Sequence, residues 1–176
     1  MEDQTILRSE ADRLQPALLD RLTDDEPEQR QETLQNSVVS KGRLKRTVLR
    51  DLVWLLNTTA HNTSGQLDDY PEIRSSVMNY GIPVLSGKNF SGVDWRELER
   101  QIHDAILAFE PRILPDSLSV KANVPTDPMD HHNLLQFELR GELWSMPYPV
   151  ELLLRSELDL ETGYMKLTDQ LASGGG

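Results

Sequence analysis

The chain has 176 residues, enough to bury the core of one domain but not of two, and its 38% hydrophobic and 27% charged residues are ordinary for a globular protein. The absence of cysteine excludes disulfides and thiolate metal sites, and a formal net charge of -11 argues against nucleic-acid binding, because phosphate contacts need a positive surface. The start of the chain has no apolar segment typical of a signal peptide, and no run of about 18 apolar residues occurs, so we expect a cytoplasmic protein without a membrane-spanning helix.

The sequence predicts one central domain with an extension at each end. Residues 1–35 are expected to form a partly ordered N-terminal extension, because regularly spaced leucines predict a short helix within residues 9–22. Residues 36–165 are expected to form a single domain. Residues 166–176 end in Ser-Gly-Gly-Gly, and we expect them to form a flexible tail.

A long amphipathic helix is predicted at about residues 40–57, where apolar residues recur at helical spacing along one broad face. Residues 33–50 carry five Lys and Arg residues and no acid. Arg43, Arg46 and Arg50 are spaced three and four apart, so they form a basic stripe, and Trp54 falls on the same polar side. Two interpretations stay open: a solvated helix face, or a protein-binding surface, since Arg and Trp are enriched at binding hot spots.

Two further helices follow along the chain. Residues 72–80 are predicted to form a short helix with Pro71 at its first position. The clearest start signal is at Asp94, which we expect to cap a helix that ends near Phe109, because Pro111 pushes the residue before it out of the helical region.

The last third of the chain carries strand signals. Apolar residues alternate with polar ones in residues 118–124, 135–143 and 152–160, and the loops between these segments contain prolines. The simplest topology is an antiparallel three-stranded meander, and helices covering one face of it give an α+β fold. We expect the last strand, residues 150–161, to lie at an edge, where a strand of another protein can add to it.

Motifs that carry chemistry are missing from the sequence. No Gly-rich phosphate loop, nucleophile turn, zinc-protease motif or calcium loop occurs, so we expect neither an enzyme nor a cofactor. The densest group of possible metal ligands is in one loop, but it lacks zinc spacing, so we interpret it as a polar turn and expect no metal. This group comprises Asp127, Asp130, His131 and His132.

The main alternative function is a lysozyme-like glycan hydrolase. Such an enzyme needs two carboxylates held across a cleft. Glu110 paired with Asp104 or Asp116 is one choice among 29 acids, and nothing in the sequence singles it out.

Glu110, Pro111 and Arg112 directly follow the helix that starts at Asp94, and they are part of an ordered series of segments that resembles one family. The other segments are residues 18–23, 37–38, 50–52, 55–58, 70–71, 79–83, 132–133, 141–144 and 157–163. Together they resemble TssE, the baseplate wedge subunit of bacterial type VI secretion systems, whose family also contains the small wedge protein of contractile phage tail baseplates.

The resemblance implies a cytoplasmic, non-catalytic part of a contractile injection machine. It implies contacts with other wedge proteins of the TssF, TssG and TssK types, and with sheath proteins of the TssB and TssC types where the sheath begins to polymerise. A regulatory adaptor that binds a single partner is a further alternative, suggested by the acidic charge and the small size.

We expect the partner-binding residues to fall into two groups. The first is Glu110, Pro111 and Arg112, because residues two apart in an extended segment point to the same side and can present a carboxylate and a guanidinium as one unit. The local alternative is that Arg112 neutralises the helix C-terminus while Glu110 is solvated. The second group is the basic stripe with its aromatic, comprising Arg43, Arg46, Arg50 and Trp54.

Overall fold

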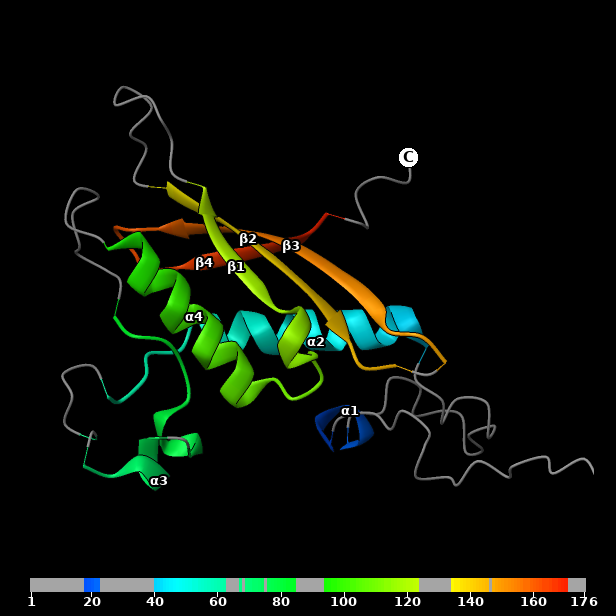
Figure 1. Cartoon of the computed structure of the whole chain (residues 1–176), viewed down its shortest axis with the longest axis horizontal. Helices are drawn as coiled ribbons and strands as arrows, with labels where there is room; N and C mark the ends of the chain where they lie inside the picture. The colour runs from blue at the N-terminus through cyan, green and yellow to red at the C-terminus, as the bar shows by residue number, and fades with distance from the viewer. Residues whose placement is uncertain are drawn as a thin grey trace, which may run out of the picture.

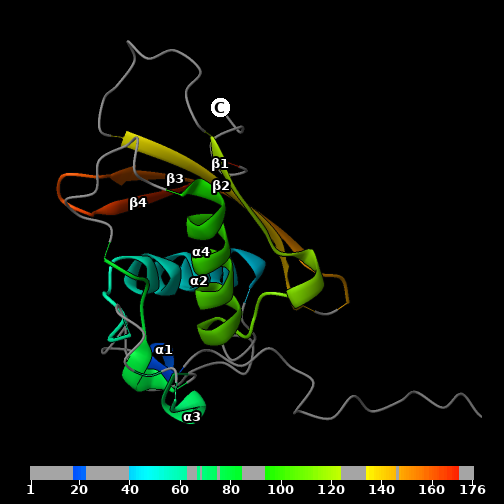
Figure 2. The same ribbon diagram turned by 60° about the vertical axis from the view of Figure 1, so that its left-hand side comes forward.

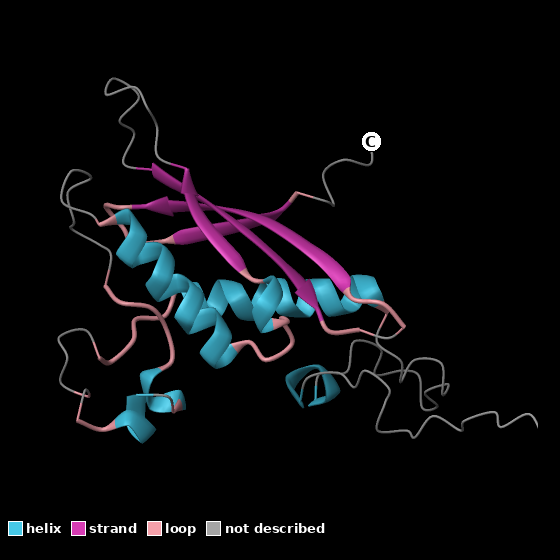
Figure 3. Ribbon diagram, in the orientation of Figure 1, coloured by secondary structure: helices cyan, strands magenta, loops and turns pink. Residues whose placement is uncertain are grey.

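The computed structural model describes residues 18–22, 40–62, 67, 69–74, 76–84, 94–123, 134–145 and 147–170. Two long helices, α2 (Lys41–Leu56) and α4 (Trp95–Phe109), cover one face of a four-stranded sheet (Figure 1, Figure 3). The view in Figure 2 shows both helices on the same side of the sheet, so the fold is α+β with two layers, as the sequence predicts.

The sheet is antiparallel, with its strands in the order β1-β2-β3-β4. The strands are β1 (Ser119–Asn123), β2 (Leu134–Leu143), β3 (Val150–Asp159) and β4 (Met165–Asp169). The prediction of three strands is therefore wrong by one. The fourth strand also lies mostly within residues 166–176, so the sheet extends beyond the domain boundary expected at residue 165.

The turn between β3 and β4 explains how the extra strand forms. Gly163 has a φ of 73°, a conformation that favours glycine, and the carboxylate of Asp159 accepts hydrogen bonds from the N–H groups of Glu161 and Thr162. Met165 and Leu167 then alternate into the core. Because β4 pairs along one side of β3, β3 is an internal strand, and the expectation that residues 150–161 form an edge is wrong.

Short-range signals set the two long helices as expected. The Ser40 side chain caps α2 by accepting a hydrogen bond from the N–H of Arg43, and the Asp94 carboxylate caps α4 by accepting from the N–H groups of Arg96 and Glu97. Helix α4 ends at Phe109, as predicted.

The remaining helices are short: α1 (Leu18–Leu22), α3 (Pro71–Arg74) and two 3-10 turns, η2 (Val77–Asn79) and η4 (Pro115–Ser117). The predicted single helix at residues 72–80 is wrong. Ser76 has an extended backbone and caps η2, so α3 and η2 are separate elements. Of the helix predicted within residues 9–22, only α1 lies in the described part.

The core is the layer between the helices and the sheet. Buried side chains of α2 and α4 pack on the inward-facing residues of the strands, and α4 lies against β1 while α2 lies against β4. The fully buried residues include Leu52, Leu55, Leu56, Ile102, Ile106, Phe137, Leu139, Leu154 and Leu158. No helix of the described residues lies on the opposite face of the sheet (Figure 1).

Candidate functional site

Glu110 and Arg112 form a tight ion pair at the end of α4. The Nε of Arg112 donates to Oε1 of Glu110 at 2.6 Å, and its Nη2 donates to Oε2 at 2.5 Å, which is the two-pronged geometry that suits a guanidinium and a carboxylate. The backbone N–H of Arg112 also donates to Oε1 at 3.2 Å. Glu110 is only 3% exposed, so the alternative in which Glu110 is solvated is wrong.

Asp51 of α2 joins this pair from another part of the chain. Its Oδ2 accepts a hydrogen bond from Nη2 of Arg112 at 2.5 Å, and its Oδ1 accepts one from Nε of Arg50 at 2.9 Å. We call Asp51, Glu110 and Arg112 the Arg112 cluster. With Arg50 included, two acids face two arginines, so the charges balance locally.

The cluster lies at the boundary between core and solvent. The side chains of Asp51 and Arg112 are 23% and 25% exposed. Burial opposes the charge of the guanidinium, but its hydrogen bonds to Glu110 and Asp51 outweigh burial and raise the pKa of Arg112 above its ordinary value. Arg112 therefore stays charged at every pH at which the protein is folded.

Tyr80 packs beside the cluster and closes its inner side. Its hydroxyl donates to the backbone carbonyl of Asp51 at 3.4 Å, and its ring meets Phe109 edge-to-face at 5.2 Å between centroids. Burial raises the pKa of Tyr80, and the nearby carboxylates of Asp51 and Glu110 raise it further. Sequence reasoning did not identify Tyr80 as part of this site.

The backbone around Arg112 continues the sheet. The carbonyl of Arg112 accepts a hydrogen bond from the N–H of Trp144 at 2.8 Å, and the N–H of Leu114 donates to the carbonyl of Glu142 at 2.8 Å. Ile113 is thereby bridged to Leu143 at the end of β2. The Arg112 cluster thus joins three elements, α2, α4 and β2, and it fixes the segment next to the half-exposed Trp144.

The predicted basic stripe divides into two parts. Arg50 is bound to Asp51 and lies 5.0 Å from the centre of the Trp54 ring, and Trp54 is 50% exposed. Contacts therefore run without a break from Trp54 through Arg50 and Asp51 to Arg112 and Glu110. Arg43 and Arg46 lie further towards the start of α2 and take no part in this network, and Pro111 is exposed beside it.

Of the residues that complete the cluster, sequence reasoning missed Asp51. It stands 61 positions before Arg112, and no local pattern connects the two. The signal that was available is its position: Asp51 is the single acid in the helix Lys41–Leu56.

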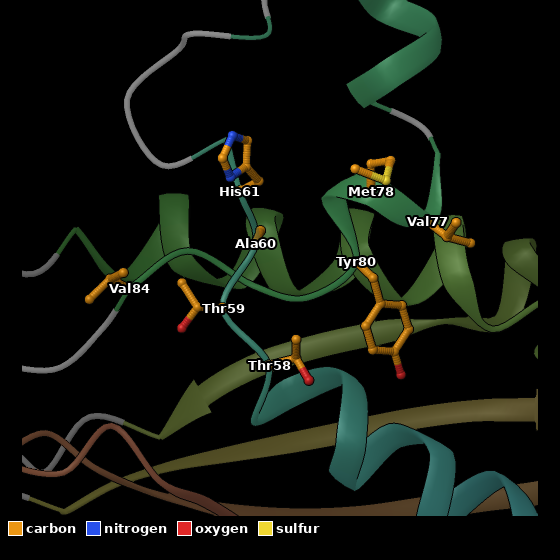
Figure 4. Close-up of a pocket in the computed structure, with 8 residues that line it drawn as sticks. All are labelled: Thr58, Thr59, Ala60, His61, Val77, Met78, Tyr80 and Val84. Atoms are coloured by element: carbon orange, nitrogen blue, oxygen red, sulfur yellow. The ribbon is translucent and has the colours of Figure 1, made fainter.

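Outside the Arg112 cluster, the features of the described residues that could carry another function are a pocket, a metal site and a membrane-spanning helix. An open depression of about 750 Å³ lies between η2 and the segment after α2, and Thr58, Ala60, His61, Met78 and Val84 are among its lining residues (Figure 4). Within the described residues, no group of three or more His, Asp or Glu side chains could hold a metal, and no helix is long and apolar enough to cross a membrane. The loop with Asp127, Asp130, His131 and His132 lies outside the described residues.

The carboxylates nominated for a hydrolase, Glu110 with Asp104 or Asp116, lie in different surroundings. Glu110 is enclosed by Arg112, whereas Asp104 is exposed on α4 and bonded to Arg100, and Asp116 is exposed in η4. A general acid has to reach a substrate, and Glu110 does not. The geometry therefore gives this pair no support as a catalytic centre.

Comparison with known proteins gives the class of protein as a baseplate wedge protein. The model of the family described as "Baseplate wedge protein gp25" matches residues 42–148, which is more than half of the chain. The chain belongs to this baseplate wedge family, which confirms the family indicated by its sequence segments.

Two other comparisons add little. A solved structure titled "The baseplate complex from the type VI secretion system" is similar at 23% identity, covering 66% of this chain and 94% of that chain, with a TM-score of 0.41. No curated protein matches the chain.

Proposed function

We propose that the protein is a non-catalytic wedge subunit in the baseplate of a type VI secretion machine, where it works in the cytoplasm. In this role it binds other wedge subunits of the TssF, TssG and TssK types and helps to connect the baseplate to a sheath of TssB- and TssC-type proteins. The observation that carries the proposal is the family match across residues 42–148. The ordered TssE-like segments of the sequence favour the secretion system over a phage tail.

The Arg112 cluster supports a role for Glu110, Pro111 and Arg112 in assembly. In this role the cluster acts indirectly, by fixing the shape of a binding surface. It holds the segment that pairs with the end of β2, and this pairing orients Trp144, which is 45% exposed. Exposed aromatics on a rigid support are typical of binding surfaces. The exposed quarter of Arg112 lies at the same surface.

The edges of the sheet favour one place for contact with an extended segment of the sheath. On β1, the outward N–H of Ala122 is capped at 2.6 Å by the carboxylate of Glu99 from α4. On β4, Asn57 makes two hydrogen bonds of 2.8 Å to the backbone N–H and carbonyl of Met165. On the β4 edge, the first outward-facing backbone groups after Met165 are therefore those of Leu167.

The register of β4 identifies its outward-facing groups. Gln170 donates its N–H to the carbonyl of Leu153, so even-numbered residues of β4 bond to β3 and odd-numbered residues face outward. Within the described part of the chain, the outward N–H and carbonyl of Leu167 have no hydrogen-bond partner. Such an edge can accept a strand from another protein.

The test is to co-express the tagged full-length chain with its wedge and sheath proteins, to purify it by the tag, and to identify what comes with it. We expect several wedge proteins together. A single partner outside the baseplate would favour the adaptor alternative. In parallel, a turbidity assay on peptidoglycan is expected to show no hydrolysis, and activity that disappears in Glu110→Gln while the circular dichroism spectrum stays unchanged would overturn the structural role.

A further inference from the structure

Four cations in the first two turns of α2 have no ion-pair partner among the described residues. Lys41 and Arg46 are exposed, and Arg43 and Lys45 are half-buried. Within the described residues, none of the four has a carboxylate at ion-pair distance, whereas Arg50, one turn further on, is bound to Asp51. At about 100° per residue, Lys41 and Lys45 lie on the other side of the helix from Arg43 and Arg46. We call Arg43 and Arg46, which share a side of α2 with Arg50 and Trp54, the α2 basic patch. They stand out because the chain as a whole has a net charge of -11.

The patch lies at the end of the helix where cations are least favourable. The N-terminus of a helix carries partial positive charge, so acids stabilise it and bases do not, and α2 has no acid in its first turn. Ser40 already caps the helix through the N–H of Arg43, and a glutamate at position 43 would complete a capping box. Gly42 adds a further cost to helix stability, although a Cβ there would meet nothing within 4 Å.

The cations near the N-terminus of α2 and Gly42 lower the stability of the helix, and no ion pair among the described residues offsets this loss. Residues that break local rules in this way are candidates for function. Further along the same helix side lies Trp54, which is held in place by its stack on Arg50, itself fixed by Asp51. From Arg43 to Trp54 the side chains span about 16 Å along the helix axis at 1.5 Å per residue. The surface is therefore basic in its first half and aromatic in its second.

We propose that the α2 basic patch and Trp54 bind an acidic segment of another baseplate protein, in which carboxylates are followed by a large apolar side chain. The carboxylates neutralise the unpaired cations, and the apolar side chain covers the exposed half of Trp54. The protein's own acidic residues 24–28 also match the charge, and the crosslinking experiment below distinguishes them from a partner. This inference rests on the proposed baseplate role.

The binding test compares two variants that change the net charge equally. Arg43→Glu/Arg46→Glu alters the patch, and Arg96→Glu/Lys121→Glu alters two exposed cations on α4 and β1. Each purified full-length chain is titrated against the purified complex of TssF- and TssG-type proteins by biolayer interferometry. At 0.1 M salt we expect the patch variant to bind at least about tenfold more weakly and the control to bind as the wild type does.

The salt dependence and the melting temperature separate loss of charge pairing from loss of fold. The difference between the two variants should shrink at 1 M salt, because the screening length falls from about 10 Å at 0.1 M to about 3 Å at 1 M. The melting temperature of Arg43→Glu should equal or exceed that of the wild type, because the new glutamate sits at the favourable end of α2. Weak binding by a more stable protein cannot result from unfolding.

Photocrosslinking then identifies the bound segment. Gly42→p-benzoylphenylalanine places a reactive group where nothing lies within 4 Å of the Cβ position. An adduct with an acidic, apolar-ended segment of a wedge protein supports the proposal. An adduct with residues 24–28 of the same chain, or equal binding by the two charge variants, overturns it while leaving the baseplate role intact. If the wild-type chain binds no wedge protein, the baseplate role itself fails, and this proposal fails with it.

Discussion

Removing Arg112 should destabilise the fold, because it leaves a buried carboxylate without its partner. Glu110 is 3% exposed, and both of its oxygens accept hydrogen bonds from Arg112. Breaking a buried ion pair by removing one partner costs about 3–5 kcal/mol. Because Arg112 is 25% exposed and water can enter the space it leaves, we expect Arg112→Ala to lower the free energy of unfolding by about 3 kcal/mol, the lower end of that range.

The measurement is urea unfolding followed by circular dichroism, with the thermal midpoint as a second readout. For a chain of this size, about 3 kcal/mol corresponds to a fall of roughly 6–12 °C in melting temperature. Arg112→Lys should lie between the alanine variant and the wild type, because lysine keeps the charge but loses the two-pronged geometry. Asp51→Asn should lower the free energy of unfolding by only about 1 kcal/mol, because Asp51 is more exposed than Glu110 and its Oδ1 accepts its hydrogen bond from Arg50, not from Arg112.

A double-mutant cycle isolates the pair itself. Glu110→Gln/Arg112→Met removes both charges. Its loss in free energy of unfolding should be smaller, by at least about 1 kcal/mol, than the summed losses of Glu110→Gln and Arg112→Met, because no buried charge is left without a partner. If Arg112→Ala lowers the free energy of unfolding by less than about 1 kcal/mol, the claim that the cluster clamps α2, α4 and β2 together is refuted. Impaired sheath formation at an unchanged melting temperature would instead show that Arg112 contacts a partner directly.

Four further predictions follow from single residues. Ser156→Ala should raise the free energy of unfolding by about 1 kcal/mol in urea titrations, because the Ser156 hydroxyl is fully buried and has no hydrogen-bond partner among the described residues; a loss of stability would reveal a partner for it. Gly81→Ala should destabilise by at least about 2 kcal/mol, because Gly81 has a φ of 124° and a Cβ would lie 2.3 Å from the carbonyl oxygen of Thr58; a change within error would contradict this geometry. Leu167→Pro removes the outward N–H of Leu167 on β4, and relative to Leu167→Ala it should reduce sheath assembly in cells at similar melting temperature; equal assembly by both would argue against strand addition at this edge. The hydrogen bond from the backbone N–H of Glu161 lowers the pKa of Asp159 in the folded protein, so the Asp159 carboxylate stabilises the fold above its unfolded pKa and this stabilisation is lost as the pH falls through its folded pKa. The difference in melting temperature between the wild type and Asp159→Asn should therefore be larger at pH 7 than at pH 3. A difference that does not change with pH would refute the role of the charge.

Short-range patterns in the sequence were sufficient to predict the main helices and the strands. A capping serine or aspartate, apolar spacing and a following proline act within a few residues, so α2, α4 and the strands β1, β2 and β3 appear close to their predicted positions. The approach of Glu110 to Arg112 was also predictable, because the two residues lie two positions apart around a proline. The strand β4 was missed because a short alternation just before a glycine-rich end is a weak signal.

Contacts between distant parts of the chain were decided only by the tertiary structure. Arg112 meets Asp51 across 61 positions, and Asn57 binds Met165 across 108, and neither pairing follows from local sequence patterns. The burial of Glu110 was decided in the same way, because only the packing around the end of α4 leaves its side chain 3% exposed. Local propensities act over a single turn, whereas burial and ion pairing depend on which surfaces the packed core brings together; the sequence thus determined the elements, and the packing of α2 and α4 on the sheet determined the site.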